Sequence, residues 1–173
     1  MIDSIFIGTR LEALEILKLY TNVRLIITNK SSRVLQEYRN SDANIQIISA
    51  TNKTKMFDLL SKRKSNLVLS AGFPYICPSY VLKNGSLFLN SHPALLPSYK
   101  GKNPIKDALK CKERYMGVTL HHMIEEVDAG PIIVQEKVLV SGLSIQDIYQ
   151  LLFGVVEPFV VAKGLDFIIN KHF

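Results

Sequence analysis

Residues 2–28 read IDSIFIGTRLEALEILKLYTNVRLIIT, and this stretch decides the class of fold. A β-branched run at 2–8 is followed by a leucine-rich amphipathic stretch at 10–20 and by a second β-branched run at 23–28. Such an order is typical of two parallel strands joined by a crossover helix, because parallel strands need a connection of a dozen or more residues. The stretch therefore predicts an α/β fold.

The same alternation continues along the chain. We expect further strands at residues 45–48, 67–71, 86–91, 117–124 and 131–140, and helices at residues 31–39, 53–63 and 144–172, the last kinked at Pro158. This order indicates a doubly wound, mostly parallel, Rossmann-like sheet flanked by helices. Since no linker or repeat divides the chain, we expect one domain over residues 1–173, with the helix at 144–172 as part of it.

Composition narrows the class of protein. With 173 residues, 47% of them hydrophobic, the chain can bury a core and is not globally disordered. We expect a cytoplasmic protein without a membrane span, because the N-terminus has no basic signal-peptide region and charged residues interrupt the longest apolar tract, 151–169. The net charge of +6 favours an anionic ligand, and no nucleic-acid recognition motif is present.

Ligands of doubly wound sheets bind beyond the carboxyl ends of the strands, so the loops there are the candidate sites. The first loop, Gly8-Thr9-Arg10, has a single glycine. It matches neither the dinucleotide-binding pattern nor a P-loop. A nicotinamide-dependent or ATP-dependent enzyme is therefore disfavoured.

The loop after the strand at 86–91 carries polar side chains suited to acyl chemistry. Asn90 and His92 are two residues apart, so their side chains should leave one face of the strand while Ser91 points to the other. An asparagine N–H can stabilise an oxyanion, and a histidine can donate or carry a proton near neutral pH. Asp128, in a predicted turn between two strands, could accept a proton from an attacking amine or raise the pKa of the imidazole.

Structural roles for these residues stay open at this point. Asn90 could cap a turn, His92 could be a hydrogen-bonded rim residue, and Asp128 could simply form a turn. Spacing alone does not show that the three lie together. His121 and His122 fit no metal-ligand spacing and lie in a predicted strand, so no metal site is expected.

Three segments together resemble the folate-dependent formyltransferase family: NSHPALLPSYKG at residues 90–101, GVTLH at 117–121 and DAGPIIVQ at 128–135. The resemblance implies transfer of a formyl group from N10-formyltetrahydrofolate to a primary amine, without a metal. It matches Asn90, His92 and Asp128 to the catalytic trio of the family. The folate pocket of the family is similar to residues 69–78 and to the turn before Asp128. The residues implied in cofactor binding are Phe73, Pro74, Tyr75, Ile76, Cys77, Val127 and Asp128.

The implied substrate is a small amine that carries phosphate. Residues 99–104 (YKGKNP) resemble the sugar N-formyltransferases most closely, which implies a nucleotide-linked amino sugar bound by Arg10, Lys100, Lys102 and Asn103. Glycinamide ribonucleotide formyltransferase is the alternative, but the Ser-Gly-x-Gly-Ser-Asn loop of that enzyme is missing from residues 8–12.

Two further readings are less expected. The chain ends after one helix, where methionyl-tRNA formyltransferases continue into a barrel, so formylation of transfer RNA is disfavoured. A folate-binding domain without catalysis is disfavoured because all three polar residues are present. A homodimer stays open, since the usual C-terminal extension of sugar formyltransferases is missing.

Overall fold

The computed structural model describes residues 1–40, 46–49 and 52–172. The chain divides into two compact units, Met1–Leu89 and Asn90–Phe173, and each is described by itself. The expectation of one domain stays a prediction. None of the described helices combines the length and the hydropathy that a membrane span needs.

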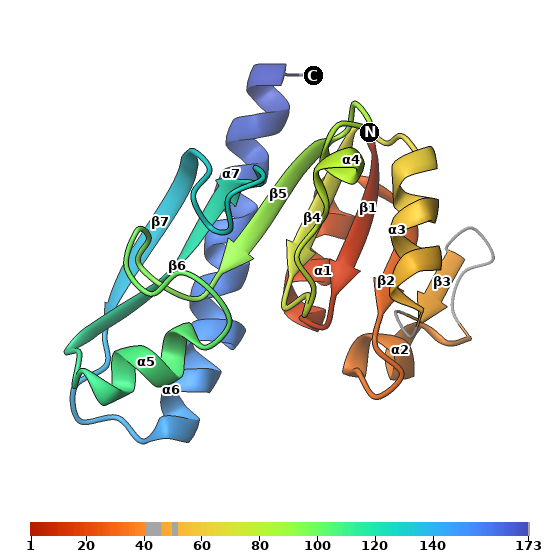
Figure 1. Cartoon of the computed structure of the whole chain (residues 1–173). Helices are drawn as coiled ribbons and strands as arrows, with labels where there is room; N and C mark the ends of the chain where they lie inside the picture. Colours follow the sequence, from red (N-terminus) through yellow and green to blue (C-terminus); the bar gives the residue numbers. More distant parts are fainter. Residues whose placement is uncertain (41–45, 50–51, 173) are drawn as a thin grey trace. The chain divides into compact units, whose positions relative to one another are not determined.

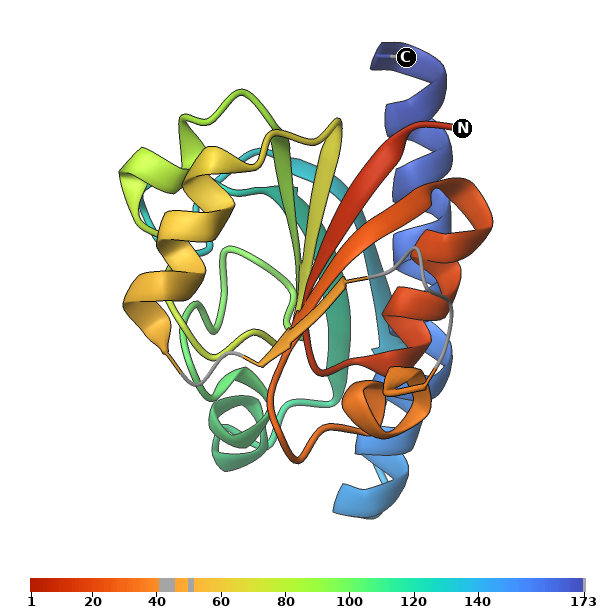
Figure 2. The ribbon, with the colours of Figure 1, turned by 90° about the vertical axis from the view of Figure 1, so that its right-hand side faces the viewer.

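The first unit alternates strands and helices. Its elements are β1 (Asp3–Gly8), α1 (Leu11–Tyr20), β2 (Asn22–Thr28), α2 (Arg33–Tyr38), β3 (Gln46–Ser49), α3 (Lys53–Lys62), β4 (Leu67–Ala71) and α4 (Ser79–Leu82). The strands pair in parallel in the order β3-β2-β1-β4. Helices α1 and α2 cover one face of these strands, and α3 covers the other (Figures 1 and 2). The predicted doubly wound sheet is thereby confirmed.

Continuous apolar runs explain these strands. Phe6, Ile26 and Leu69 are fully buried, as expected for parallel strands covered on both faces. The helices begin at side-chain caps: Ser32 Oγ accepts the Leu35 N–H at 3.1 Å, and Asn52 Oδ1 accepts the Lys55 N–H at 3.0 Å. The capping residues therefore mark the starts of the helices, and the buried apolar runs mark the strands.

The turn from β1 to α1 closes against the end of β4. A Cβ on Gly8 would lie 1.9 Å from the Ala71 carbonyl oxygen, so only glycine allows this approach. The same oxygen accepts the N–H groups of Thr9 at 3.0 Å and of Arg10 at 3.4 Å. These two amides are thus engaged inside the protein.

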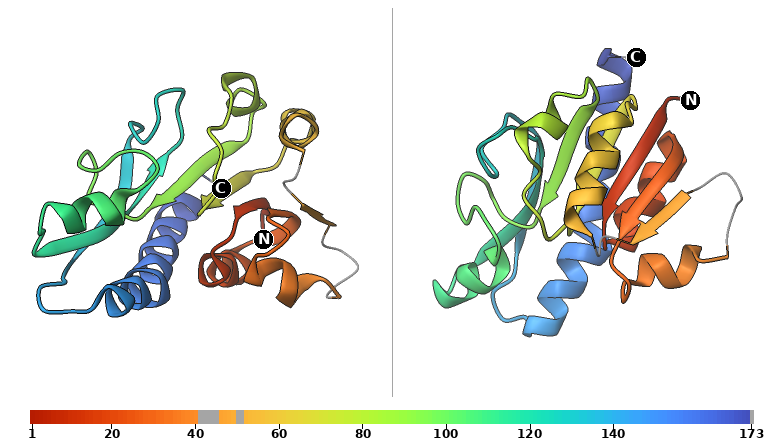
Figure 3. Two further views of the ribbon diagram at one scale, coloured as in Figure 1. Left: turned by 60° about the horizontal axis from the view of Figure 1, so that its bottom comes forward. Right: turned by 45° about the vertical axis from the view of Figure 1, so that its right-hand side comes forward.

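The second unit opens with residues 90–92 of β5 (Leu87–His92), which begins in the first unit. Its other elements are α5 (Pro104–Lys110), β6 (Tyr115–His122), β7 (Ile132–Leu139), α6 (Ile145–Leu151), a π-helical segment η1 (Leu152–Val156) and α7 (Glu157–His172). Strands β6 and β7 are antiparallel. Helices α6 and α7 lie on one face of β6 and β7, and the loops before α5 and between β6 and β7 lie on the other (Figure 3).

The single helix expected at residues 144–172 is divided in the structure. Ser144 caps α6, and five π-helical residues then separate α6 from α7. Pro158, the second residue of α7, has no N–H to donate to the preceding turn. The irregular turn is therefore directly N-terminal to the proline, and it takes the form of a π-bulge rather than the expected kink at Pro158 itself.

Candidate active site

Asp128 lies at the centre of a polar cluster in the second unit. Its Oδ2 accepts the Gly101 N–H at 2.8 Å and lies 3.4 Å from His92 Nδ1, while Asn90 Nδ2 donates to Oδ1 at 3.3 Å. Only 9% of the Asp128 side chain is exposed. The structure therefore brings together Asn90, His92 and Asp128, whose catalytic roles stay predictions.

Backbone conformation aims the Asp128 carboxylate into the cluster. Asp128 has φ 52°, in the left-handed region, which aspartate and asparagine adopt more readily than other side chains. Gly101, its hydrogen-bond donor, has φ 95°. Positive φ angles at both residues of this hydrogen bond therefore orient the carboxylate of Asp128 and the amide of Gly101 towards each other.

Strand alternation positions Asn90 and His92 on one face of β5, as expected. Ser91 points the other way, where its hydroxyl donates to Glu157 Oε1 at 2.8 Å. Glu157 begins α7 and is only 1% exposed. This buried hydrogen bond ties the end of β5 to α7 and so fixes the strand from the face opposite the cluster.

His92 is held through both ring nitrogens. Its Nε2–H donates to the Tyr99 carbonyl at 2.9 Å, and its Nδ1 faces Asp128. Burial lowers the pKa of His92, and although the Tyr99 carbonyl and the Asp128 charge raise it, burial outweighs them. The sequence-based expectation that the charge of Asp128 raises the pKa of His92 therefore has the right sign, but burial lowers this pKa by more. A neutral His92 then presents an Nδ1 lone pair to the Asp128 carboxylate. A single proton shared by these two side chains would create a hydrogen bond between them.

The Asp128 carboxylate is stabilised as an anion. Burial alone raises its pKa, but the contact with the His121 imidazole, the hydrogen bond from the Gly101 N–H and the charges that the two neighbouring histidines carry when protonated outweigh burial and lower the pKa. Asp128 is thus ionised at neutral pH and can accept a proton.

His121 is a fourth member of the cluster that the sequence did not single out. It is 1% exposed; its Nδ1–H donates to the His122 carbonyl at 2.9 Å, and its Nε2 lies 3.2 Å from Asn90 Nδ2 and 3.5 Å from Asp128 Oδ1. The available signal was the period of two along β6. Gly117, Thr119 and His121 share one face, and His121 was considered only as a metal ligand.

The loop after β5 is fastened to the same face of β6. Thr119 Oγ1 donates to the Ala94 carbonyl at 2.6 Å, and Gln135 Nε2 donates to the Leu96 carbonyl at 3.0 Å and to Thr119 Oγ1 at 2.8 Å. Thr119 is fully buried. This network holds the loop that supplies the Tyr99 carbonyl and the Gly101 amide.

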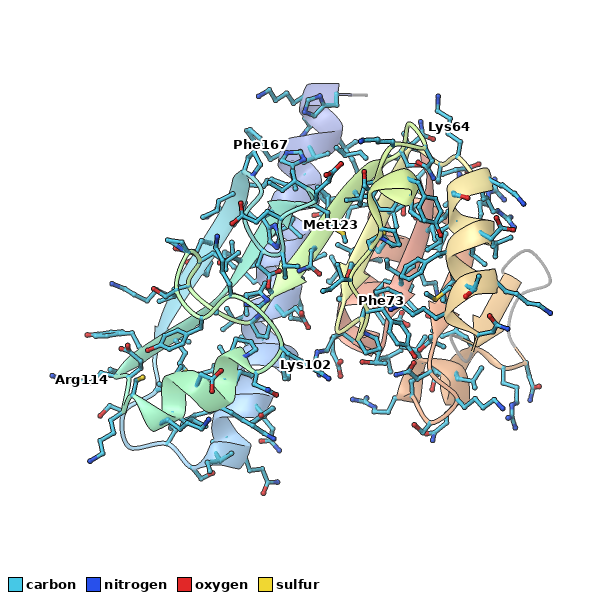
Figure 4. All side chains as sticks on the ribbon, in the orientation of Figure 1. Lys64, Phe73, Lys102, Arg114, Met123 and Phe167 are labelled. Atoms are coloured by element: carbon cyan, nitrogen blue, oxygen red, sulfur yellow. The ribbon has the colours of Figure 1, made fainter. Side chains whose placement is uncertain are left out.

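The predicted substrate-binding residues of the second unit lie on the same loop and its continuation. Lys100 Nζ pairs with Glu126 Oε1 at 3.2 Å. Lys102 is exposed and extends from the loop that precedes α5 (Figure 4). Asn103 is exposed at the N-cap of α5 and makes no side-chain capping bond. In the first unit, the Arg10 side chain lies over Gly72, where an added Cβ would be 3.2 Å from Arg10 Nε.

Aromatic and apolar side chains gather on the predicted folate loop of the first unit. The Phe73 ring, labelled in Figure 4, packs edge-on against Phe57 and Tyr75, with ring centroids 6.3 and 5.5 Å apart. Ile76 is 66% exposed and so presents an apolar side chain at the surface of the loop. Cys77 is buried, which raises the pKa of its thiol to about 12, so the thiol stays protonated at neutral pH. These features fit the flat, partly apolar ring system of a folate.

Val127, the other predicted folate residue, lies next to Asp128 in the second unit and is 38% exposed. Across residues 1–40, 46–49 and 52–172, no three His, Cys, Asp or Glu side chains are arranged to hold a metal ion. The side chains of Asn90, His92, His121 and Asp128 can transfer protons and can donate or accept hydrogen bonds.

Comparison with known proteins extends this picture. The sequence pattern of the formyl transferase family matches residues 9–151. Trifunctional purine biosynthetic protein adenosine-3 of Chironomus tentans is 36% identical over 128 residues, 68% of this chain and 9% of that protein. Methionyl-tRNA formyltransferase of Thermotoga maritima is 36% identical over 91 residues, 52% of this chain and 29% of that protein. The chain thus spans less than a third of the length of these two relatives.

Solved structures cover nearly the whole chain. Phosphoribosylglycinamide formyltransferase of Anaplasma phagocytophilum aligns with a TM-score of 0.79 and 27% identity, over 98% of this chain and 86% of that chain. Glycinamide ribonucleotide transformylase 1 of Symbiobacterium toebii aligns with a TM-score of 0.84 and 23% identity, over 99% and 89%. At this identity the second match shows the shared fold.

Proposed function

Because this chain belongs to the formyl transferase family, we propose that it transfers a formyl group from N10-formyltetrahydrofolate to a primary amine. One observation carries the proposal. An ionised, nearly buried Asp128 contacts an amide donor, Asn90, and an imidazole, His92, on one side of a strand end. Acyl transfer to an amine needs such a set: a base for the amine proton and donors for the oxyanion.

Each residue has a defined step. The amine nitrogen attacks the formyl carbon, a C–N bond forms, and the carbonyl electron pair moves to oxygen, where the Asn90 amide stabilises the oxyanion. His92, bound to the Tyr99 carbonyl and facing Asp128, positions the carboxylate. Asp128 takes a proton from the attacking nitrogen. When the carbonyl re-forms, the bond to N10 breaks and N10 takes the proton that Asp128 had accepted. The products are an N-formyl amine and tetrahydrofolate, and the protein returns to its starting state.

In the first unit, the folate would be held by the loop at residues 73–77, and the contact with Val127 of the second unit stays a prediction. The main chain of the loop is suited to the hydrogen-bonding edge of the pterin, and the exposed side chain of Ile76 is suited to its face. The nearly buried position of Asp128 keeps the base out of bulk water, which favours proton transfer from a bound amine over hydrolysis of the formyl donor.

For the amine, the comparisons favour glycinamide ribonucleotide over the nucleotide-linked amino sugar. Most of the compared solved structures that match almost the whole chain bear the names of phosphoribosylglycinamide formyltransferases or glycinamide ribonucleotide transformylases, one is a formyltetrahydrofolate deformylase, and none of the compared proteins points to a sugar amine. The engaged amides of Thr9 and Arg10 cannot also hold the substrate phosphate. In the second unit, the phosphate would rely on the side chains of Lys100 and Lys102 instead, and a contribution of Arg10 stays a prediction.

An amine panel tests this proposal. The purified chain is incubated with N10-formyltetrahydrofolate and, in separate reactions, glycinamide ribonucleotide, a nucleotide-linked amino sugar or methionyl-tRNA, and release of tetrahydrofolate is followed. We expect turnover with glycinamide ribonucleotide. Turnover with the amino sugar alone would keep the reaction and change the substrate. Absence of turnover with all three amines, from protein that still binds the folate, would contradict the proposal.

A further inference from the structure

Three polar atoms form a triangle beside the proposed reaction centre. Asn90 Nδ2 lies 3.2 Å from His121 Nε2 and 3.3 Å from Asp128 Oδ1, and these two acceptor positions are 3.5 Å apart. His121 is nearly inaccessible to solvent. Its hydrogen bonds are therefore made with protein groups, and a change in one must alter the others.

The other ring nitrogen of His121 is fixed. The His122 carbonyl can only accept, so His121 Nδ1 carries a proton in either charge state. A neutral His121 then has its lone pair at Nε2, aimed at the Asn90 amide. A protonated His121 has N–H groups at both positions, and its Nε2–H points to Asp128 instead.

The two states of His121 have opposite effects on Asn90. The neutral ring accepts an N–H from Asn90 and holds the amide toward the protein. The cationic ring repels that N–H and pairs with the carboxylate, which leaves the amide donor available to a substrate oxygen. The charged or titratable groups facing His121 are Asp128, His92 and His122, so the proton it gains can come from Asp128 without crossing solvent.

We propose that His121 is a positioning residue whose proton releases the Asn90 amide for the oxyanion. The inference rests on the proposed function. When Asp128 takes the proton of the attacking amine, the proton passes over 3.5 Å to His121 Nε2, and Asn90 turns its N–H to the new oxyanion. The proton later returns through Asp128 and ends on N10 of the folate. Proton removal and oxyanion stabilisation are thereby coupled.

Nitrogen-15 NMR of the free protein gives a test that needs no substrate. We expect neutral His121 to carry its proton on Nδ1, the reverse of the tautomer that free histidine prefers, and the side-chain amide signal of Asn90 to shift with the same pH midpoint as His121. His121→Gln keeps an acceptor near the Nε2 position but cannot take a proton. The Asn90 signal should lose this pH dependence in the variant. His122→Gln, at the neighbouring position on the other face of β6, is the matched control and should keep it.

Kinetics provide the second readout. His121→Gln should lower kcat by about 10- to 100-fold, less than the 10²–10³-fold that loss of an oxyanion donor causes, with KM nearly unchanged and a flatter pH profile. A proton on Nε2 in neutral His121, or an Asn90 signal that titrates independently of His121, would overturn the inference even if formyl transfer is confirmed. If no amine is turned over, the NMR result still decides the inference, and the proposed function fails separately.

Discussion

At the scale of single residues, the site depends on a carboxylate held in an unusual backbone conformation. Asp128 has positive φ, and the Gly101 amide, the Asn90 amide and two imidazoles surround its oxygens. Removal of the charge therefore changes the chemistry with little change in shape, because asparagine tolerates the same conformation and keeps one acceptor oxygen.

Asp128→Asn should retain the fold and lose the base. We expect kcat for the amine to fall by about 10²–10⁴-fold, the usual contribution of a general base, and KM to change little. Steady-state kinetics with circular dichroism of the same sample provide the check. A variant with normal turnover would show that another group takes the amine proton.

Acid should weaken the folded state through the same residues. Burial lowers the pKa of His92 and of His122 in the folded chain, so below the ordinary value of 6.5 the unfolded chain binds more protons. The free energy of unfolding should fall as the pH drops through 6.5. The lowered pKa of Asp128 adds a further loss as the pH falls below 3.8.

Urea unfolding at about pH 7.5 and pH 5.5 measures the effect of the histidines. His92→Gln removes one titrating group, so the loss of stability between the two values should be smaller than in the unmodified chain. An equal loss in both proteins would mean that His92 has the same pKa folded and unfolded.

Residue-level chemistry was partly predictable from sequence. Asn90, His92 and Asp128 could be chosen because their spacing and motif matched a family, and alternation alone placed Ser91 on the other face. His121 was missed, since a histidine in a strand reads equally as a buried structural residue. The effect of burial on His92 was also hidden, because the degree of burial depends on packing that no motif records.

At the scale of elements, β6 carries the side chains that hold the loop after β5. Its face toward that loop has Gly117, Thr119 and His121, and its other face has Leu120, which packs against Gly164 of α7. A Cβ on Gly117 would lie 2.0 Å from the Glu136 carbonyl oxygen and 2.5 Å from Leu95 Cδ2. No side chain fits there without a shift of β7 or of the loop.

Gly117→Ala should therefore destabilise the second unit by about 1–3 kcal/mol, the usual cost of overpacking. It should also lower kcat, because the displaced loop supplies the Tyr99 and Gly101 contacts to His92 and Asp128. Denaturant unfolding and kinetics measure both effects. Gly154→Ala is the matched control: nothing lies within 4 Å of its Cβ, so stability should change by less than about 1 kcal/mol. Equal stability of the two variants would show that the close contact of residue 117 with the Glu136 carbonyl does not restrict this position to glycine.

Element order was predictable because strands and helices differ in hydrophobic period. The strand at 67–71 agrees residue for residue with β4, and the predicted helix at 53–63 differs from α3 only at its last residue. The expected strand at 45–48 is β3, except that residue 45 lies outside the described residues. The π-helical segment was not predictable, since the apolar pattern of residues 144–172 continues through it, and only packing selects how the chain accommodates Pro158.

At the scale of the whole molecule, family and fold followed from sequence, and the substrate did not. The family match confirms the predicted formyltransferase class, because a motif of many ordered residues is specific. The prediction of an amino-sugar substrate rested on residues 99–104 and on the missing Ser-Gly-x-Gly-Ser-Asn loop at residues 8–12, and none of the compared proteins points to a sugar amine. Loop cations are weak evidence of substrate, since surface charges are common and tolerate replacement.

The net charge of +6 attracts an anionic substrate over the whole protein, whereas Lys102 is proposed to contact the substrate phosphate directly. Substitutions can distinguish these two effects. Lys102→Gln and Lys112→Gln each remove one positive charge from an exposed position, Lys102 before α5 and Lys112 after it. If Lys102 contacts the substrate phosphate, KM should rise about two- to fivefold in the first variant only, as for an exposed ion pair, with kcat unchanged. Added salt should raise KM in the unmodified chain and less so in Lys102→Gln, because the screened contact is already missing. An equal rise of KM in both variants would assign the effect to the overall field of the protein, and unchanged KM in Lys102→Gln would remove this lysine from the phosphate site.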